Sequence, residues 1–501
     1  MIRRLRRKPF LCLKKNTNVI YLSGAEIVCA SINDFTKFRI RPIYHPGTKQ
    51  EVADIMKKFI FIFILTFCCS VLIYGKNPKY IFLFIGDGMS TPQRMTADEF
   101  SRKTGRGQLA INTLPVHATT RTRSANRLVT DSAAAATAIA CGEKTNNGRI
   151  GMDVSGKRKL ESVAYAAKRK GKKVGIVTSV TINHATPAGF YANRPSRSQY
   201  YAIGLDLINS NFDYFGGGGL SKHNDKKAPE YKGDLYELAK KAGYKVISTK
   251  AELLALAPGS GKVLARGARS NLPYAIDRSP DSPTLADFTA KGIELLDNPN
   301  GFFMMVEGGA IDWCGHANQA AENMYEVLAF DDAVRVALKF ARKHPDETLI
   351  VVTGDHETGG MTMGFSGTGY AMYVERLANQ KISCNSFAAL EKKIRKDKKN
   401  YSFEDAQKLL EKYFGFKFSE KDKKDPMYIS SKELKMLKDA FKKKQLARAA
   451  RIIMNGKAGI GWTTGSHTAL PVLTTSTGVK SELFTGFIEN CDIAIKIKSI
   501  L

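Results

Sequence analysis

The sequence predicts an α/β fold built on a parallel sheet, with a helical insertion in its second half. The run at 80–85 is continuously apolar, as in strands that are covered on both faces, and 174–180, 302–306 and 348–352 also have the composition of strands. Stretches with helical character alternate with these runs along the chain. Chains that alternate strands and helices in this way form parallel sheets with helices packed on them.

The expected elements follow one another in a regular order. The first strand, 80–85, ends in Gly86-Asp87-Gly88, and an alanine-rich helix is expected within 128–142. Further helices are predicted at 160–170, 234–242, 284–298 and 320–343. Four consecutive glycines within 212–220 predict a tight loop there.

The composition changes between about 370 and 455. Lysine becomes dense, and helical patterns recur at 386–397, 403–413 and 431–445. We interpret this stretch as a helical insertion on the sheet, within a single large domain over 76–501.

The N-terminal region has the features of an exported protein. Two lysines after Met56 precede an apolar run of about fifteen residues, which is shorter than the roughly 20 residues of a spanning helix. We interpret 56–75 as a signal peptide cleaved near Gly75, and expect a periplasmic or extracellular protein with no membrane span in its mature form. Residues 1–55 are interpreted as a non-native upstream extension or a disordered tail; the alternative is a real tail with an internal anchor.

The composition also limits the function. The chain has 501 residues, 43% apolar, and carries a formal net charge of +30. Its basic residues are scattered and are not interleaved with aromatic residues, so we expect no nucleic acid as a specific partner; a positive field would attract anionic substrates. No CxxC pair occurs, which argues against a structural zinc finger, and later cysteines could pair in an oxidising compartment.

Ser132 opens the alanine-rich run, so we expect it at the N-terminus of a buried helix. Such an end presents unpaired N–H groups and the positive end of the helix dipole, both of which suit an anion. A serine hydroxyl there can be transiently esterified, and the new charge is stabilised in place. The alternative is an ordinary N-cap serine on a core helix.

Acidic residues and histidines follow the predicted strands or lie in glycine-bounded turns. They are Asp87, Glu307, Asp312, His316, Asp355, His356 and His467. Carboxylate and imidazole together are the ligand set of catalytic zinc, whereas oxygen ligands such as Glu307 and Thr186 suit magnesium. Two zinc ions a few ångströms apart stabilise the entering and leaving oxygens of an in-line phosphoryl transfer.

With these motifs the chain resembles the alkaline phosphatases. The matching segments are FIGDGM at 84–89, TDSAAAATA at 130–138, NHATPAGFYANRPSR at 183–197, VEGGAIDWCGH at 306–316, VTGDHETGG at 352–360 and TTGSHT at 463–468. They occur in the family's order and span about residues 78–490. The resemblance implies a three-layer sandwich with a mostly parallel central sheet. It also implies hydrolysis of phosphate monoesters through a phosphoserine intermediate, which releases phosphate and an alcohol.

The resemblance further implies two Zn²⁺ and one Mg²⁺ as cofactors, with Ser132 as the nucleophile. The first zinc, which lowers the pKa of the Ser132 hydroxyl, would be held by Asp87, Asp355 and His356. The second zinc, which takes the leaving-group oxygen, would be held by Asp312, His316 and His467. Magnesium would be held by Asp87, Thr186 and Glu307, with His184 contacting it weakly or through water. Arg197 would bind two phosphate oxygens, oriented by Asp131.

Two other functions compete with a phosphomonoesterase. One is a related two-zinc phosphodiesterase or sulfatase-like hydrolase, and the other is a catalytically silent phosphate-binding or adhesion protein. Diesterase relatives typically lack the magnesium site and the arginine, so Thr186, Glu307 and Arg197 favour monoesters. The complete ligand set and Ser132 argue against a silent protein.

The expected assembly is a homodimer.

Overall fold

The computed structural model describes residues 18–22, 25–29, 38–42 and 77–501. The chain divides into two compact units, Met1–Lys76 and Asn77–Leu501. In the first unit, β1 (Asn18–Leu22), β2 (Ala25–Cys29) and β3 (Phe38–Pro42) form an antiparallel sheet. The signal peptide predicted at 56–75 lies outside the described residues. Within the described part of the chain, no helix is both long and apolar enough to cross a membrane.

The second unit is built on a ten-stranded sheet with the order β17-β5-β16-β11-β4-β10-β6-β7-β9-β8. Its strands are β4 (Tyr80–Gly86), β5 (Val116–Arg121), β6 (Lys173–Thr178), β7 (Tyr214–Gly217), β8 (Tyr244–Ile247), β9 (Lys262–Arg266), β10 (Phe302–Gly308), β11 (Thr348–Gly354), β16 (Val472–Gly478) and β17 (Gly486–Glu489). All neighbouring strands of this sheet are parallel except β16, which runs antiparallel to both β11 and β5. The expected fold class, a three-layer sandwich with a mostly parallel sheet, is therefore confirmed.

The four strands expected from apolar runs correspond to β4, β6, β10 and β11. The expectation for 212–220 was incomplete, because Tyr214–Gly217 forms β7 between β6 and β9. A Cβ on Gly217, where φ is +156°, would lie 2.5 Å from the Thr178 carbonyl oxygen of the adjacent strand. The glycines thus permit close approach of backbones within the sheet as well as the turn that follows.

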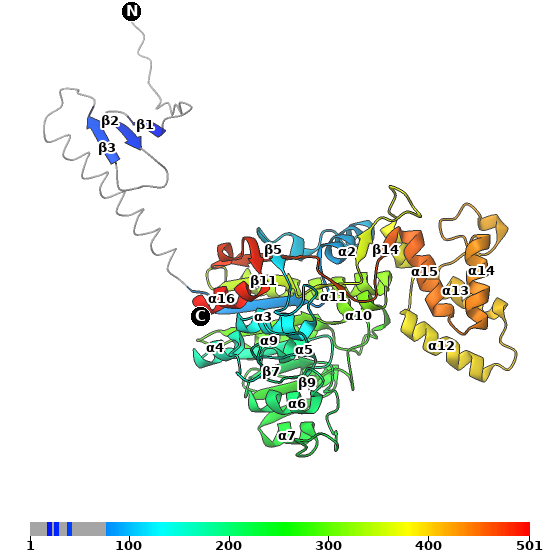
Figure 1. The fold of residues 1–501 in the computed structure, drawn as a ribbon, viewed down its shortest axis with the longest axis horizontal. Coiled ribbons are helices and arrows are strands. Elements are labelled where there is room, and N and C mark those ends of the chain that lie inside the picture. Colours follow the sequence, from blue (N-terminus) through cyan, green and yellow to red (C-terminus); the bar gives the residue numbers. More distant parts are fainter. Residues whose placement is uncertain (1–17, 23–24, 30–37, 43–76) are drawn as a thin grey trace, which may run out of the picture. The chain divides into compact units, whose positions relative to one another are not determined.

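Helices cover both faces of the sheet (Figure 1). Along β4, Phe82 and Phe84 contribute to one apolar core, whereas Ile81, Leu83 and Ile85 contribute to the other. The helices on the first core include α2 (Thr91–Lys103), α9 (Leu285–Leu296), α10 (Ala310–His316) and α11 (Ala320–Ala341). Those on the second core include α3 (Ser132–Cys141), α4 (Val163–Arg169), α5 (Ala185–Ala188), α6 (Tyr200–Asn209), α7 (Leu235–Lys241) and α16 (Asn490–Ser499).

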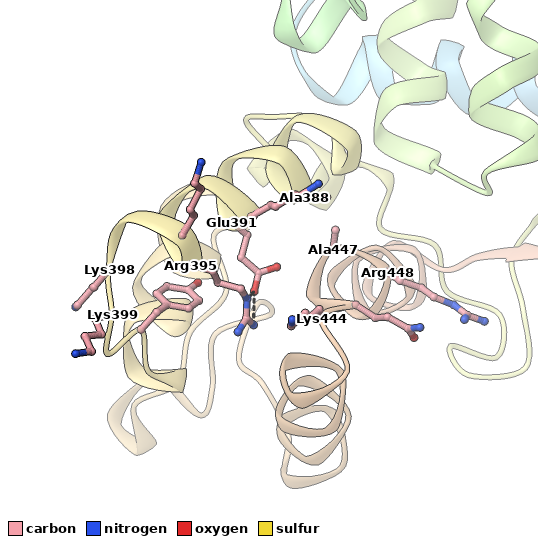
Figure 2. A pocket seen from close by; sticks show the side chains of 12 residues that line it. Ala388, Glu391, Arg395, Lys398, Lys399, Lys444, Ala447 and Arg448 are labelled. Carbon is pink, nitrogen blue, oxygen red and sulfur yellow. Dashed lines mark hydrogen bonds and ion pairs between the residues drawn. The ribbon is translucent and has the colours of Figure 1, made fainter.

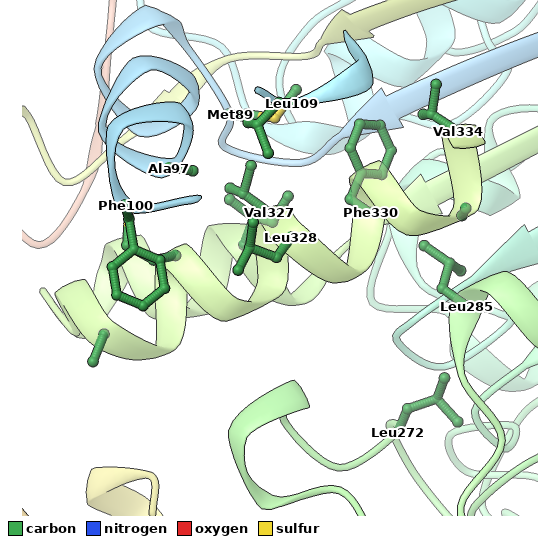
Figure 3. Packing of buried hydrophobic residues seen from close by; sticks show 14 of the residues in the cluster. Met89, Ala97, Phe100, Leu109, Leu272, Leu285, Val327, Leu328, Phe330 and Val334 are labelled. Atoms are coloured by element: carbon green, nitrogen blue, oxygen red, sulfur yellow. The ribbon is translucent and has the colours of Figure 1, made fainter. Parts of the chain in front are cut away.

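The long helix α11 organises the first core. Figure 3 shows its Val327 and Leu328 beside Ala97 and Phe100 of α2. Farther along the helix, the Phe330 ring packs edge-on against Phe84 of β4 at 5.9 Å between centroids. Because α11 begins directly after the loop that follows α10, this packing fixes the position of that loop relative to the sheet.

The lysine-rich stretch forms α12 (Cys384–Asp397), α13 (Phe403–Phe414) and α14 (Ser431–Lys442), as the helical patterns predict, followed by α15 (Leu446–Ala458). In Figure 1 these yellow and orange helices gather to one side of the sheet. Their buried Phe387, Leu410 and Leu437 belong to the same apolar core as α11. The insertion is therefore packed continuously with the rest of the unit.

A cavity of about 850 Å³ lies between α12 and α15, and most of the residues that line it are basic (Figure 2). Glu391 is neutralised there by Arg395, at 2.6 Å between Oε1 and Nη2. Arg395 is held in turn by the Tyr401 and Phe441 rings, whose centroids lie 4.9 and 4.1 Å from its guanidinium carbon. None of the predicted site residues lines this cavity.

Candidate active site

Three carboxylates meet at the carboxyl ends of the central strands. Asp87 follows β4, Glu307 is the penultimate residue of β10, and Asp355 follows β11. Gly86 lies opposite both Gly308 and Gly354 in the sheet, so the three strands end at the same level. All three carboxylates are fully buried. Ligand sites of open α/β sheets lie at this edge.

Ser132 is the first residue of α3, as the sequence predicts, but it is not the cap. Asp131 is the N-cap, and its Oδ1 accepts a hydrogen bond from the Ala134 N–H at 3.0 Å. The Ser132 hydroxyl does not serve as the cap, and its Oγ lies 3.2 Å from His356 Nε2. The interpretation of Ser132 as an ordinary N-cap serine is therefore wrong.

Asp131 also holds the predicted phosphate-binding arginine. Its Oδ2 accepts hydrogen bonds from the Gly148 N–H at 3.0 Å and from Arg197 Nη1 at 3.1 Å. The other terminal nitrogen of Arg197, Nη2, lies 3.4 Å from His184 Nε2. The guanidinium is thus fixed between the start of α3 and the N-cap of α5.

Within the part of the chain that the structure describes, side chains that can hold cations form three overlapping groups. The ligand atoms of each group lie within 4.8 Å of one another. The groups are Asp87, Asp355 and His356; Asp312, His356 and His467; and Asp87, His184 and Glu307. The first group has the composition predicted for the first zinc site. The second contains His356 where His316 is predicted. The third joins His184, which is predicted beside the magnesium, to the predicted magnesium ligands Asp87 and Glu307.

His316 and Thr186 nevertheless lie at the edges of these groups. His316 Nε2 is 3.4 Å from Asp312 Oδ2 and 3.1 Å from His467 Nε2. Thr186 Oγ1 is 3.4 Å from Asp87 Oδ2. The structure therefore brings together every residue that the sequence proposes for the site.

The donor atoms of the site fit cations. Within the described residues, the buried atoms that lack a hydrogen-bond partner include Asp87 Oδ1, Asp355 Oδ2, Glu307 Oε1 and His184 Nδ1. A buried polar group without a partner is destabilising by about 1–3 kcal/mol, and by more when it is charged. Metal ions would provide the missing partners, since carboxylate oxygens and neutral imidazole are ligands of Zn²⁺ and Mg²⁺.

The electrostatics of the buried carboxylates lead to the same conclusion. Burial raises the pKa of Asp355 to about 7 and that of Glu307 to about 8. Burial, reinforced by the neighbouring Asp355, Asp312 and Glu307 carboxylates, also holds the pKa of Asp87 well above its usual range. A cluster of carboxylates that resists ionisation by itself becomes stable in its charged form when cations bind to it.

The histidines differ according to their neighbours. Burial, together with the Arg197 charge, lowers the pKa of His184 to about 4, so its imidazole is neutral at pH 7. The hydrogen bond with Asp312 raises the pKa of His316 to about 9. His316 Nδ1 lies 2.8 Å from the Gly465 carbonyl oxygen, and His467 Nδ1 lies 2.8 Å from the Thr130 carbonyl oxygen. If Nδ1 carries the proton in each ring, Nε2 is left available to a metal.

Sequence reasoning missed several residues that support these ligands. The Thr178 hydroxyl donates to Glu307 Oε2, and the Thr358 hydroxyl donates to Asp312 and lies 3.2 Å from His356 Nδ1. Thr178 lies within the strand predicted at 174–180, and Thr358 lies within the motif VTGDHETGG, so only their positions could have pointed to them. Nothing in the sequence shows that their hydroxyls reach carboxylates far away along the chain.

Comparison with known proteins gives a consistent result. The family model described as "Alkaline phosphatase" matches residues 78–501. Alkaline phosphatase 3 of Bacillus subtilis is 34% identical over 430 residues, which cover 83% of this chain and 87% of that protein. The alkaline phosphatase of Escherichia coli is 32% identical over 333 residues, covering 56% of this chain and 70% of that protein. The crystal structure of a cold-active alkaline phosphatase from the psychrophile Shewanella sp. matches with a TM-score of 0.74 and 32% identity, covering 84% of this chain and 99% of that one.

Proposed function

This chain belongs to the alkaline phosphatase family, and from that premise we propose which of its residues perform the reaction. It is a metal-binding hydrolase that cleaves phosphate monoesters through a phosphoserine intermediate. We propose the roles of individual residues, the identity of the metals, the export of the protein and its assembly.

Ser132 is the proposed nucleophile. Its Oγ stands at the N-terminus of α3 and lies 3.2 Å from His356 Nε2, within the group of metal-ligand candidates. In the proposed reaction, Oγ forms a bond to phosphorus as the bond to the alcohol oxygen breaks. Water then cleaves the phosphoserine and regenerates the hydroxyl. The N–H groups and dipole of α3 stabilise the negative charge on the phosphoryl oxygens.

Two Zn²⁺ and one Mg²⁺ are the proposed cofactors. Asp87, Asp355 and His356 would hold the first zinc; Asp312, His316 and His467 would hold the second; Asp87, Thr186 and Glu307 would hold magnesium, beside His184. When bound, these ions supply Lewis-acid stabilisation of the serine, leaving-group and phosphoryl oxygens. The chain's own part is to orient the ligands, through the Asp312 contact with Thr358 and the His467 contact with the Thr130 carbonyl.

Arg197 is proposed to bind two oxygens of the phosphoryl group. Asp131 fixes one side of its guanidinium, and the contact at 3.4 Å with His184 directs the other side toward the third group of ligands. A guanidinium in this position favours a dianion with three unesterified oxygens over a diester. This placement favours a monoesterase over the diesterase and sulfatase-like alternatives.

Export and assembly also belong to the proposal. The charged and apolar segment at 56–75 supports a periplasmic or extracellular location, with a mature chain that starts near Lys76. N-terminal sequencing of the protein secreted from its native host tests this, since peptides from residues 1–55 in the mature protein would contradict it. The expected homodimer is tested by light scattering of the purified protein.

The experiment that tests the proposed site uses the chain from Lys76 onward. We expect Ser132→Ala to abolish labelling by phosphate at acid pH and most turnover of an aryl phosphate. The matched control is Ser155→Ala, which removes an exposed hydroxyl bonded to Asp153 and should retain full activity. Labelling that persists in Ser132→Ala would show that another residue is the nucleophile, and metal analysis of the same samples would show which ions are bound.

A further inference from the structure

The loop at 317–319 directly follows His316 and joins α10 to α11. Its position matters because His316 is the most exposed histidine of the site, with 41% of its side chain accessible, compared with 12% for His467. Packing alone therefore holds His316 less firmly than the other ligand candidates. Hydrogen bonds from its surroundings have to supply the remaining restraint.

Asn318 connects this loop to the segment that carries His467. Its backbone is left-handed, with φ +52°, a conformation that asparagine tolerates better than most residues. Its Nδ2 donates to the Thr464 carbonyl oxygen at 2.8 Å and to the Gly315 carbonyl oxygen at 3.2 Å. One amide thus joins the residue before His316 to the turn from which His467 emerges.

The last helix of the insertion holds the same loop from the opposite side. Asn455 of α15 is 7% exposed; its Nδ2 donates to the Asn318 carbonyl oxygen at 2.8 Å, and its Oδ1 accepts from the Ala320 N–H at 3.4 Å. Arg451, one turn earlier on α15, donates through Nη1 to the Ala317 carbonyl oxygen. Backbone groups on both sides of this loop are therefore fixed by a helix that lies far away along the chain.

We propose that Asn318 and Asn455 are positioning residues for His316, so that helix α15 of the insertion forms part of the support of the second zinc site. The inference rests on the proposed function, because it takes His316 as a zinc ligand. Groups that orient metal ligands typically change metal affinity about 10–100-fold when they are removed. The effect should be confined to the site that contains His316, since neither asparagine contacts a ligand of the other two sites.

The test compares three variants of the zinc-loaded chain from Lys76 onward. Asn455→Ala removes both hydrogen bonds that Asn455 makes with the loop. Asn318→Gly removes the side-chain bridge while tolerating the positive φ. Ile452→Ala is the control, because Ile452 lies on the same helix and is 43% exposed. Zinc release to a chromogenic chelator, the zinc dependence of kcat and the melting temperature of the metal-free protein are measured for each.

We expect Asn455→Ala and Asn318→Gly to release one of the two zinc ions about 10–100-fold faster than the unmodified protein. Added zinc should restore their kcat, and Ile452→Ala should behave as the unmodified protein. If the unmodified protein binds zinc and both asparagine variants release it as slowly as the unmodified protein does, the positioning role is wrong and the proposed function stands. Uniform release of all metals, in step with a lower melting temperature of the metal-free variants, would also refute the proposal, since it indicates a general structural role. An unmodified protein that binds no zinc would refute the proposed function itself.

Discussion

Asp131 and Arg197 are joined by a hydrogen bond of 3.1 Å between the carboxylate Oδ2 and the guanidinium Nη1. The other carboxylate oxygen of Asp131 caps α3, directly before Ser132. One side chain therefore fixes both the helix end that presents the proposed nucleophile and the guanidinium proposed to bind the phosphoryl group.

Two substitutions of Asp131 separate these roles. Asp131→Asn retains an oxygen that can cap α3 but loses the charged partner of Arg197, whereas Asp131→Ala loses both. A hydrogen bond to a charged group contributes about 1.5–3 kcal/mol, so we expect both variants to weaken inhibition by inorganic phosphate about tenfold or more. Only Asp131→Ala should also lose about 1 kcal/mol of stability, because its cap is gone. Phosphate inhibition constants and denaturant melts check this, and unchanged inhibition in both variants would contradict it.

The preference for monoesters should depend on Arg197. In a diester, an esterified oxygen replaces one of the oxygens that the guanidinium would bind, which leaves a charged donor without its partner. Such a group is destabilising by about 1–3 kcal/mol or more, and each 1.36 kcal/mol is about tenfold in rate. We expect kcat/KM for an aryl phosphate to exceed that for its methyl diester by several powers of ten. Arg197→Ala should reduce this ratio by slowing the monoester reaction more, and a ratio that stays constant would favour the diesterase alternative.

Metal removal should make stability depend on pH. In the metal-free protein, the pKa of Asp355 is raised from 3.8 to about 7 and that of Glu307 from 4.5 to about 8. A carboxyl group whose pKa is raised by folding stabilises the folded state at low pH. This contribution is lost as the pH rises through the pKa of the folded state, here between about pH 4 and pH 8. The rise in melting temperature on metal binding should therefore be larger at pH 8 than at pH 5. Glu307→Gln should reduce that increase, and a metal contribution that is constant or falls over this range would contradict the prediction.

Gly88 should tolerate no side chain, because its backbone is left-handed and lies against the backbone of Asp312. Its φ is +71°, and a Cβ would lie 2.8 Å from the Cα of Asp312, a proposed zinc ligand. Gly107 is a matched control, with φ +77° and no atom within 4 Å of an added Cβ. Both substitutions by alanine should incur the strain of a positive φ, about 1 kcal/mol. Only Gly88→Ala should also lose metal and activity, and equal metal content in the two variants would show that the close approach to Asp312 is unimportant.

The sequence by itself determined the local features of this protein. The apolar runs at 80–85 and 302–306 could be recognised as buried strands, because a short run that is apolar at every position is typical of a strand covered on both faces. The helices of the insertion were recognisable for the same kind of reason, since their apolar positions recur with a helical period. Motifs such as FIGDGM and VTGDHETGG identified the family and hence the expected ligands, and the family match is confirmed over 78–501.

Only the tertiary structure decided how these features combine. β7 forms within a glycine-rich segment because β6 and β9 supply its hydrogen-bond partners, and neither lies next to it in the sequence. Asp131, and not Ser132, caps α3, and Asn455 reaches Asn318 across 137 positions of the chain. A local pattern fixes the period and the burial of an element, whereas the partner of a hydrogen bond between distant segments depends on the packing of the whole fold.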